Sequence, residues 1–444
     1  MKALISFFGL VVLTLLPRPV LGESWGSVEF PKSKIEIIWY CGELERALTQ
    51  LARRYDGAEV MVRCVPINDW HAQIFGDFAR KGGADLVMLD SQFIGEAVAG
   101  GHVIELTGWM KDNVDTSKYV PKSLSVYGEY PQGSGRYYGI PALADTQVLV
   151  YRSDLYSHVD VQLDYKAKTG RGLEVPRTWS ELLLQARFFK ESPWVKGGYV
   201  ATWRGKRGYD EISTQWNQIL WSFGGELWDP GTLRVNGVLN SPQGVVALEF
   251  ARELFLTGPN EGAYNFGFDE VVDSLCRGEA AIGNIWFALA HRFLDRERCK
   301  YSDRLAFGIL PGEVRHAISL GGQGISVSAY SKNKEAALFF IKWFESEEVQ
   351  MEWARLGGTS ARSSVLKSDV FIGAAPYNRY FLESFGLAKD FWNLPEYGLM
   401  LAVSQEYLEK AIVGEMTPRE ALNAIARRQQ EILDVAYPKG QKAK

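Results

Sequence analysis

Apolar and polar positions along the first part of the chain predict strands and helices in alternation. Residues 35–40 (IEIIWY) form a continuous apolar run, which is typical of a strand buried in a parallel sheet. Residues 43–55 then carry Leu44, Leu48 and Leu51 at helical spacing. The same reasoning predicts strands at residues 59–65 and 85–89 and helices at residues 70–80 and 92–99. This order predicts an α/β fold, in which helices cover a mostly parallel sheet.

A second series of elements begins after residues 138–152 (YGIPALADTQVLVYR), which predict an extended segment that leads into a strand at 148–151. Further strands are predicted at residues 199–203, 280–286, 305–309 and 319–327, and helices at 178–190, 209–223, 240–255 and 269–277. The tail, residues 392–433, is predicted to be helical, with a new helix starting at Thr417-Pro418.

The length of the chain indicates two lobes. A sequence of 444 residues with 46% apolar content is too long for one ordinary domain and can bury sizeable cores. No low-complexity linker separates two halves, which is expected if the chain crosses between the lobes several times. The net charge of −4 gives no electrostatic support for nucleic-acid binding.

The first 22 residues predict a secretory signal peptide. Lys2 precedes an apolar run at residues 3–16, which is too short to span a bilayer, and cleavage is expected before Glu23. No cysteine directly follows the run, so we expect a periplasmic, non-lipidated protein with no membrane insertion after the signal is removed.

Four cysteines permit two disulfides in an exported chain. Cys41 is expected at the end of the first predicted strand and Cys64 at the end of the second, and adjacent parallel strands could bring them together. Cys276 and Cys299 flank Trp286 and could fasten that unit. Spacing alone leaves both pairings open. A metal site is not expected, because no CxxC motif or histidine cluster occurs among 5 histidines.

Five motifs in a fixed order give the chain a family resemblance. They are the first strand, loop and helix; the strand that starts at Asp85; the GIP segment at residues 139–141; the block from Asn240 to Trp286, with its GEAAIG turn and strand; and the return segment from Gly321 to Trp343. From about residue 34 to 433, the sequence resembles the family 1 extracellular solute-binding proteins of ABC importers, the maltose-binding protein-like group.

The resemblance implies a two-lobed periplasmic-binding-protein fold, in which several crossing segments join two mixed, mostly parallel sheets flanked by helices. Lobe one is expected to comprise residues 23–144 and 322–366, and lobe two residues 145–321 and 367–444. The implied partners are a small carbohydrate ligand and the permease subunits of an ABC transporter with its cytoplasmic ATPase. The resemblance implies no cofactor, no catalytic residue and a monomer.

The resemblance also implies ligand-binding residues in lobe one. Tyr40 and Glu43 belong to the loop after the first strand, and Asp90 and Gln92 to the loop after the third. Asp145 stands in an otherwise apolar crossing segment, where a family carboxylate binds sugar hydroxyls. Glu43 and Asp90 have alternative roles at helix N-termini, because acids there interact favourably with the helix dipole or cap the helix.

In lobe two, Trp286 is the expected stacking platform, since an aromatic face packs well against the C–H face of a sugar ring. The other candidates implied there or at the crossing segments are Trp203, Arg204, Gly321, Gly322, Trp392 and Tyr397. Arg204, Lys206 and Arg207 form a basic cluster, which fits either a solvated loop or recognition of an acidic or phosphorylated sugar.

The sequence favours a binding protein that captures a sugar, sugar alcohol or short oligosaccharide. An exported glycoside hydrolase is an alternative, although the chain has no GxSxG, HExxH or P-loop motif. A binder of iron or polyamine with the same fold is another alternative. Iron binders of this fold use clustered tyrosines, but Tyr137-Tyr138 lies just before the crossing, where the family places no ligand residue. A sensory binding protein would share the fold and the ligand, so the sequence does not separate it from a transport protein.

Overall fold

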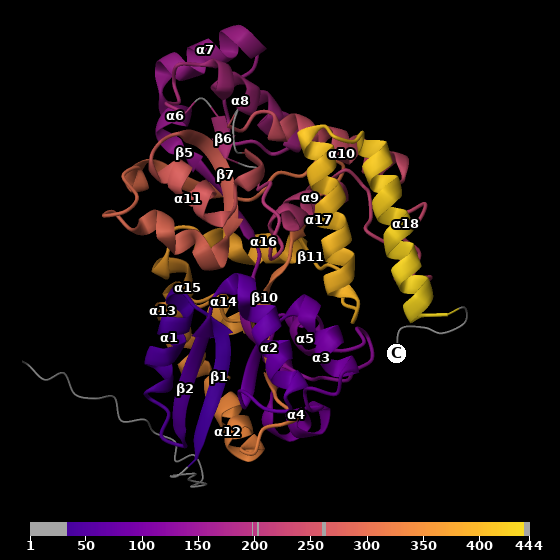
Figure 1. Ribbon diagram of the computed structural model, residues 1–444. Helices are drawn as coiled ribbons and strands as arrows, with labels where there is room; N and C mark the ends of the chain where they lie inside the picture. The colour runs from indigo at the N-terminus through magenta and orange to yellow at the C-terminus, as the bar shows by residue number, and fades with distance from the viewer. Residues whose placement is uncertain (1–32, 198, 202–203, 260–262, 439–444) are drawn as a thin grey trace, which may run out of the picture.

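The computed structural model describes residues 33–197, 199–201, 204–259 and 263–438. The predicted signal peptide and Trp203 lie outside these residues. Two separate β-sheets, each with its own helices, form two lobes stacked along the long axis of the molecule (Figure 1). The predicted two-lobed α/β fold class is confirmed.

The first lobe is built on a sheet with the strand order β2-β1-β3-β10-β4 among the described residues. Its strands are β1 (Lys34–Tyr40), β2 (Glu59–Val65), β3 (Leu86–Asp90), β4 (Ile140–Asp145) and β10 (Gly321–Val327). Its helices include α1 (Glu43–Ala52), α2 (Trp70–Ala79), α3 (Ile94–Ala99), α4 (Thr107–Asn113), α5 (Pro121–Gly128), α12 (Lys334–Phe344) and α13 (Glu347–Arg355).

The second lobe is built on the sheet β6-β7-β5-β8. Its strands are β5 (Gln147–Arg152), β6 (Tyr199–Ala201), β7 (Ala280–Trp286) and β8 (Leu305–Gly308), and β9 (Ile318–Ser319) pairs with β11 (Ala388–Lys389) nearby. Its helices include α6 (Ser153–Ser157), α7 (Val159–Thr169), α8 (Trp179–Glu191), α9 (Glu211–Ser222), α10 (Pro242–Phe255), α11 (Phe268–Cys276), α16 (Phe381–Leu387), α17 (Tyr397–Val413) and α18 (Pro418–Ala436). The short helices α14 (Ser363–Leu366) and α15 (Asp369–Ala374) follow α13.

The sheets contain more antiparallel pairing than the predicted mostly parallel arrangement. β1 pairs in parallel with β2 and β3, but β10 is antiparallel to both β3 and β4. In the second sheet, β5 is antiparallel to β7 and β8, and β6 is parallel to β7. The difference arises at the crossings, because a chain that returns from the other lobe enters the sheet from its opposite end.

Three predicted helix starts are built as the sequence indicates. Thr178 and Thr417 each cap a helix in a reciprocal arrangement with a glutamate, Glu181 and Glu420 respectively. Ser241 caps α10, whose first residue is Pro242. These starts fix the helices that cover the second sheet.

The chain passes between the sheets at the junction of β4 with β5 and again between β9 and β10. Gly322, at the second crossing, has φ +97°, and a Cβ there would lie 2.3 Å from the carbonyl oxygen of Leu143. A third passage lies between α13, which packs on α1, and α16, which packs on β5. The predicted lobe boundaries, 23–144 and 322–366 against 145–321 and 367–444, remain a prediction.

Both cysteine pairs form disulfides in the structure. Cys41–Cys64 joins the carboxyl ends of β1 and β2, and Cys276–Cys299 joins the end of α11 to the segment before β8. Each lobe therefore carries one covalent cross-link.

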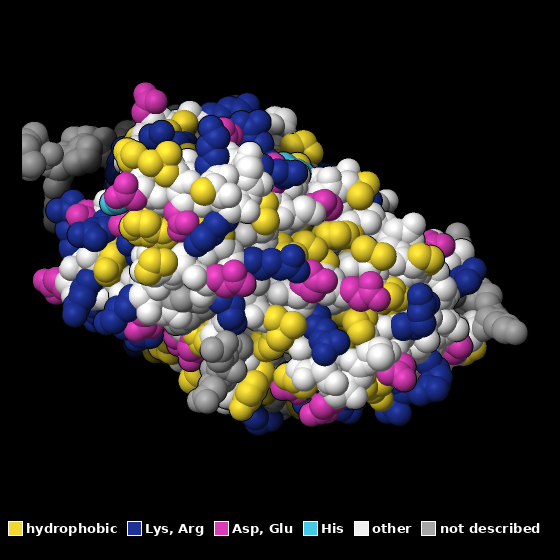
Figure 2. Space-filling view, turned by 90° about the horizontal axis from the view of Figure 1, so that it is seen from above, with side chains coloured by type: hydrophobic (Ala, Val, Ile, Leu, Met, Phe, Trp, Pro, Cys, Tyr) yellow, Lys and Arg dark blue, Asp and Glu magenta, His cyan; other side chains and the backbone are white. Residues whose placement is uncertain are grey.

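The surface carries charges of both signs. Acidic and basic side chains are interspersed over the face shown in Figure 2. Among the described residues, none of the helices combines the length and the apolar character needed to cross a bilayer.

Candidate functional site

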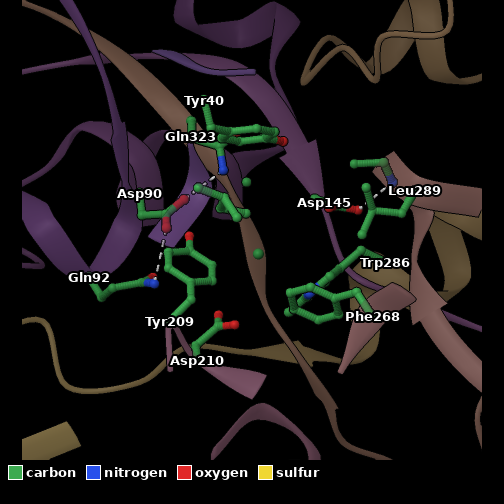
Figure 3. A pocket seen from close by; sticks show the side chains of 14 residues that line it. Tyr40, Asp90, Gln92, Asp145, Tyr209, Asp210, Phe268, Trp286, Leu289 and Gln323 are labelled. Atoms are coloured by element: carbon green, nitrogen blue, oxygen red, sulfur yellow. Dashed lines mark hydrogen bonds between the residues drawn. The ribbon is translucent and has the colours of Figure 1, made fainter. Parts of the chain in front are cut away.

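A pocket lies between the two lobes (Figure 3). Tyr40, Asp90, Gln92 and Gln323 reach it from the first lobe, and the second lobe supplies an aromatic wall and further polar groups. The described lining residues are Tyr40, Ile67, Asp90, Gln92, Asp145, Tyr209, Asp210, Phe268, Trp286, Ala288, Leu289, Gly321, Gly322 and Gln323. Both lobes therefore contribute to the lining of one pocket.

On the first-lobe face, Asp90 is held by two side-chain amides. Gln323 Nε2 donates to Asp90 Oδ1 at 2.6 Å, and Gln92 Nε2 donates to Oδ2 at 3.2 Å. Behind them, the Ser91 hydroxyl lies 3.0 Å from a carboxylate oxygen of Asp390. β3 and β10 are neighbours with Gln323 opposite Asp90, so the sheet register itself positions this network.

Asp145 occupies the crossing between the sheets. Its Oδ1 accepts hydrogen bonds from the backbone N–H groups of Thr146 at 2.8 Å and Ala288 at 3.2 Å. The Tyr127 hydroxyl donates to the carbonyl of Gly321 at 2.5 Å and accepts from the Asp145 N–H at 3.2 Å. Tyr127 thereby ties the two crossing segments together beside the pocket.

Trp286 ends β7 and lies against the second crossing. A Cβ on Gly321 would come within 2.8 Å of the Trp286 ring, so only a glycine leaves room for this indole. Gly321 thus serves to accommodate Trp286, and Gly322 supplies a left-handed backbone conformation. These roles give a structural reason for the two glycines that the sequence singled out.

The second-lobe face adds Tyr209, Asp210 and Phe268, which lead into α9 and α11 (Figure 3). The Asp210 side chain is buried, and its Oδ1 has no hydrogen-bond partner among the described residues. The Tyr209 ring lies 6.4 Å from that of Trp70, between centroids, and so contacts the first lobe. This side of the pocket combines apolar rings with one unsatisfied carboxylate oxygen.

Burial raises the pKa of the carboxyl groups that line the pocket. It raises the pKa of Asp145 to about 8 and that of Asp210 to about 7, and it raises the pKa of Asp90 well above its ordinary value. Hydrogen bonds to Asp90 and Asp145 and the charge of Arg204 near Asp210 oppose the effect. Burial and the nearby Asp145 and Asp90 also raise the pKa of Tyr40.

The structure brings seven of the residues predicted from the sequence to this pocket: Tyr40, Asp90, Gln92, Asp145, Trp286, Gly321 and Gly322. Their predicted role in ligand binding remains a prediction. The structure places four others elsewhere, and Trp203 lies outside the described residues.

Glu43 and Arg204 do not line the pocket. Glu43 opens α1 at the rim, where its Oε2 lies 2.8 Å from Nε2 of His291 in the second lobe. Arg204 is fully buried behind the pocket, donates to the Asn284 carbonyl at 3.0 Å, and lies over the Phe268 ring. Its guanidinium supports the second-lobe wall, because charge and ring attract each other there.

Trp392 and Tyr397 are core residues next to the pocket rather than part of its lining. Both side chains are buried, with ring centroids 6.3 Å apart, and Tyr397 also packs near Phe93. The tail thus contributes apolar packing at the junction of the lobes. The sequence showed their aromatic character but not their depth.

Several lining residues were missed by sequence reasoning: Ile67, Tyr209, Asp210, Phe268, Ala288, Leu289 and Gln323. The Gly-Gly-Gln order of the return segment could have indicated Gln323, which follows the two selected glycines. Asp210 stands directly before a helix and is easily interpreted as a cap, but its side chain makes no cap hydrogen bond in α9.

The described residues contain no group of three or more histidine, cysteine, aspartate or glutamate side chains arranged to hold a metal ion. The described lining of the pocket offers hydrogen-bonding groups and aromatic rings. Such a lining is suited to holding a small polar molecule between the lobes.

The model of the family described as "Bacterial extracellular solute-binding protein" matches residues 42–351. This chain belongs to that family. A mannitol-binding protein of Pseudomonas aeruginosa is 26% identical over 334 residues, covering 69% of this chain and 71% of the relative. A probable amino-acid ABC transporter periplasmic-binding protein of Sinorhizobium fredii is 24% identical, and the matched segment spans 58% of this chain and 54% of that relative.

Solved structures of binding proteins share the fold of this chain over about nine tenths of its length. Maltose-bound MalE3 of T. maritima superimposes with a TM-score of 0.77 at 25% identity, covering 90% of this chain and 100% of that one. A solute-binding protein of Agrobacterium radiobacter K84 in complex with ribitol gives a TM-score of 0.77 at 24% identity, covering 91% and 100%.

Proposed function

We propose that this protein is the periplasmic binding component of an ABC importer and captures a sugar or sugar alcohol between its lobes. The observation that carries the proposal is the pocket itself, because polar groups of the first lobe face an aromatic wall of the second. The protein then delivers the ligand to membrane permease subunits served by a cytoplasmic ATPase.

The mechanism follows from the division of the pocket between the lobes. A ligand that contacts both faces stabilises the closed arrangement relative to the open one. Contacts that cross the cleft around the pocket support closure without ligand, namely Tyr209 with Trp70 and Glu43 with His291. The crossing segments at Asp145 and Gly321 then act as the hinge.

The lining chemistry suits a polyhydroxylated ligand. Aromatic rings pack against C–H groups, and carboxylate and amide groups exchange hydrogen bonds with hydroxyls. The similar proteins named for mannitol, and those solved with maltose and ribitol, support this ligand class. Because a buried polar group without a partner is costly, such pairing also provides specificity.

A thermal-shift screen of residues 23–444 tests the proposal. The panel contains sugars, sugar alcohols, sugar acids, amino acids, polyamines and ferric ion. A ligand at about 100 times its dissociation constant adds about 2.7 kcal/mol of stability, which is easily visible. We expect a response to one carbohydrate group and its loss in Trp286→Ala.

Trp194→Ala is the matched control. Trp194 is a half-buried tryptophan whose Nε1 donates to Asp164, remote from the pocket-lining residues, so this variant should keep the response. A response to ferric ion or polyamine alone would keep the fold and overturn the carbohydrate ligand. Turnover of an oligosaccharide that Asp145→Asn abolishes would instead establish the exported hydrolase.

We further propose that the protein is a non-lipidated monomer in the periplasm. Cell fractionation and the mass of the purified protein in solution test this, and a membrane-bound or dimeric form would contradict it.

A further inference from the structure

The described lining of the pocket contains acidic side chains and no basic ones. Asp90, Asp145 and Asp210 line it, and none of the described lining residues is lysine, arginine or histidine. Hydroxyl groups of a neutral sugar alcohol do not need three carboxylates, because amides and hydroxyls can serve them equally well. The lining therefore raises the question of the charge of the ligand.

The nearby cations are already engaged with other groups. Arg204 Nη1 donates to the Asn284 carbonyl, and its Nη2 lies 3.2 Å from both Gln147 Oε1 and Thr214 Oγ1. Its Nε lies 3.9 Å from Glu211, a second buried carboxylate. Arg207 pairs with Glu409 at the surface. Arg204 and Arg207 thus make these contacts outside the pocket lining, and a phosphorylated or acidic sugar would meet three acidic side chains and no basic one among the described lining residues.

The polar atoms of the lining that await a partner are hydrogen-bond acceptors. Asp210 Oδ1 and Gln323 Oε1 are both buried and have no partner among the described residues. The amide nitrogen of Gln323 already donates to Asp90, which leaves its oxygen to accept. An ammonium has three N–H donors, whereas a hydroxyl has one O–H donor. An ammonium therefore matches these two unpaired acceptors better than a hydroxyl does.

The three carboxylates differ in how far they are satisfied. Both oxygens of Asp90 accept amide N–H groups, and one oxygen of Asp145 accepts two backbone N–H groups. Asp210 is the least satisfied of the three, and its side chain lies next to Tyr209 on the aromatic side of the pocket (Figure 3). Aromatic faces attract cations as well, so the Trp286 and Phe268 side chains add to the same preference.

We propose that the ligand is a polyhydroxylated amine, such as an amino sugar or amino sugar alcohol, whose ammonium group binds Asp210. The inference rests on the proposed carbohydrate-binding function and specifies its ligand class. The hydroxyl groups are bound by the Asp90–Gln92–Gln323 network, and the ammonium pairs with the carboxylate form of Asp210. Charged partners around Asp210 are Arg204 and Glu211 behind it and Asp90 and Asp145 across the pocket.

Calorimetric titration with matched compounds tests the charge preference. D-mannitol, 1-amino-1-deoxy-D-mannitol and mannitol 1-phosphate share one carbon chain and differ in one terminal group, and the sorbitol and glucose series provide two further skeletons. We expect the amine to bind at least about tenfold more tightly than its neutral parent, which corresponds to about 1.4 kcal/mol, and the phosphate not to bind.

Asp210→Asn should reduce the ratio of the affinities for the amine and for its neutral parent to less than about threefold. Asp145→Asn provides a second variant in case the first is poorly folded. Asp273→Asn, which removes an exposed carboxylate from α11, should leave the preference unchanged.

The pH dependence gives an independent measure. Burial raises the pKa of Asp210 to about 7, so the carboxylate that binds the ammonium becomes fully available only above that pH. Affinity for the amine should therefore increase severalfold from about pH 6 to about pH 8 in the wild type, and this increase should be smaller in Asp210→Asn.

The outcomes separate the two proposals. Equal or tighter binding of the neutral compound would overturn the amine and leave the carbohydrate-binding function intact. Tighter binding of spermidine than of any amino carbohydrate would overturn the polyhydroxylated ligand. Failure of every neutral and aminated carbohydrate would overturn the proposed function together with this inference.

Discussion

The two faces of the pocket are built on different principles. On the first-lobe face, Asp90, Gln92 and Gln323 already satisfy most of one another's hydrogen bonds. The second-lobe face consists of Trp286, Phe268 and Tyr209, with Asp210 left partly unsatisfied. If the ligand binds here as proposed, one face is pre-organised before it arrives, and the other gains its missing interactions on binding. Stability and affinity should therefore respond differently to substitutions on the two faces.

The largest loss of stability is expected for Gly322→Ala, in the crossing segment between the two lobes. A Cβ there would lie 2.3 Å from the Leu143 carbonyl oxygen and 2.7 Å from the Asp145 nitrogen, at φ +97°. Overpacking against backbone together with the strained φ should lower the free energy of unfolding by about 3 kcal/mol or more. Denaturant titration measures this loss.

Gly357→Ala separates the two causes. Gly357 has φ +95°, and a Cβ at this position would meet no described atom within 4 Å, so the substitution carries the conformational cost without the clash. It should lose only about 1 kcal/mol. Equal losses in both variants would show that the crossing has room for a side chain.

The next largest loss of stability is expected for Gln323→Ala, on the first-lobe face of the pocket. This change removes the amide that donates to Asp90 Oδ1 and leaves a buried acceptor without a partner. We expect the unliganded protein to lose about 2 kcal/mol of stability in denaturant titration. An unchanged free energy of unfolding would mean that water replaces the amide and that this face is not pre-organised.

A smaller effect of opposite sign is expected from Asp210→Asn on the unliganded protein. Its pKa is raised to about 7 in the folded state, so the folded protein holds this proton more strongly than the unfolded chain does. Stability is then lost as the pH rises from the unfolded pKa, about 4, towards 7, and the substitution should recover about 1–2 kcal/mol at about pH 8.

The wild-type protein should also lose stability as the pH rises, because several buried acids contribute. Burial raises the pKa of Asp145 to about 8 and that of Asp390 and Glu345 to about 7. The melting temperature should fall from about pH 5.5 to about pH 8. The lowered pKa of His102 and His291 acts in the opposite direction. A melting temperature that rises over this range would contradict the burial of these acids.

The smallest effect is expected at the rim, in Glu43→Gln. The contact of Glu43 with His291 joins the lobes in a half-exposed position, where such pairs contribute about 0.5 kcal/mol. Ligand release should become about twofold faster in stopped-flow measurements. Glu45→Gln, in the same helical turn but bonded to Thr49, should leave the release rate unchanged. A tenfold faster release in Glu43→Gln would show instead that the contact between Glu43 and His291 is the main interaction that keeps the lobes closed.

Local patterns predicted much of the fold. Continuous apolar runs gave the buried strands, and Thr417-Pro418 and Ser241-Pro242 gave helix starts, because capping depends on residues within one turn. The direction of strand pairing at the crossings could not be read in this way. β10 joins partners distant in sequence, β3 and β4, so its orientation depends on the path of the whole chain.

Local patterns also located part of the candidate site. Asp90 and Trp286 stand at the ends of strands, where parallel and mixed sheets commonly place ligand groups, so strand prediction locates them. The positions of Asp210 and Phe268 depend on the buried Arg204, whose guanidinium lies over the Phe268 ring and near Glu211, the first residue of α9. Arg204 itself looked like a surface or ligand-binding cation, because charge alone does not reveal burial.

The interior position of β10 in the first sheet has a consequence for the order in which the protein can fold. β10 lies between β3 and β4, although more than two hundred residues separate β3 from it in the sequence. An emerging chain cannot complete its N-terminal lobe until residue 327 has been synthesised. The N-terminal lobe therefore stays incompletely folded during most of the synthesis of the chain. For a polypeptide that is predicted to leave the cytoplasm, this keeps the chain in a form that can still pass through a membrane channel.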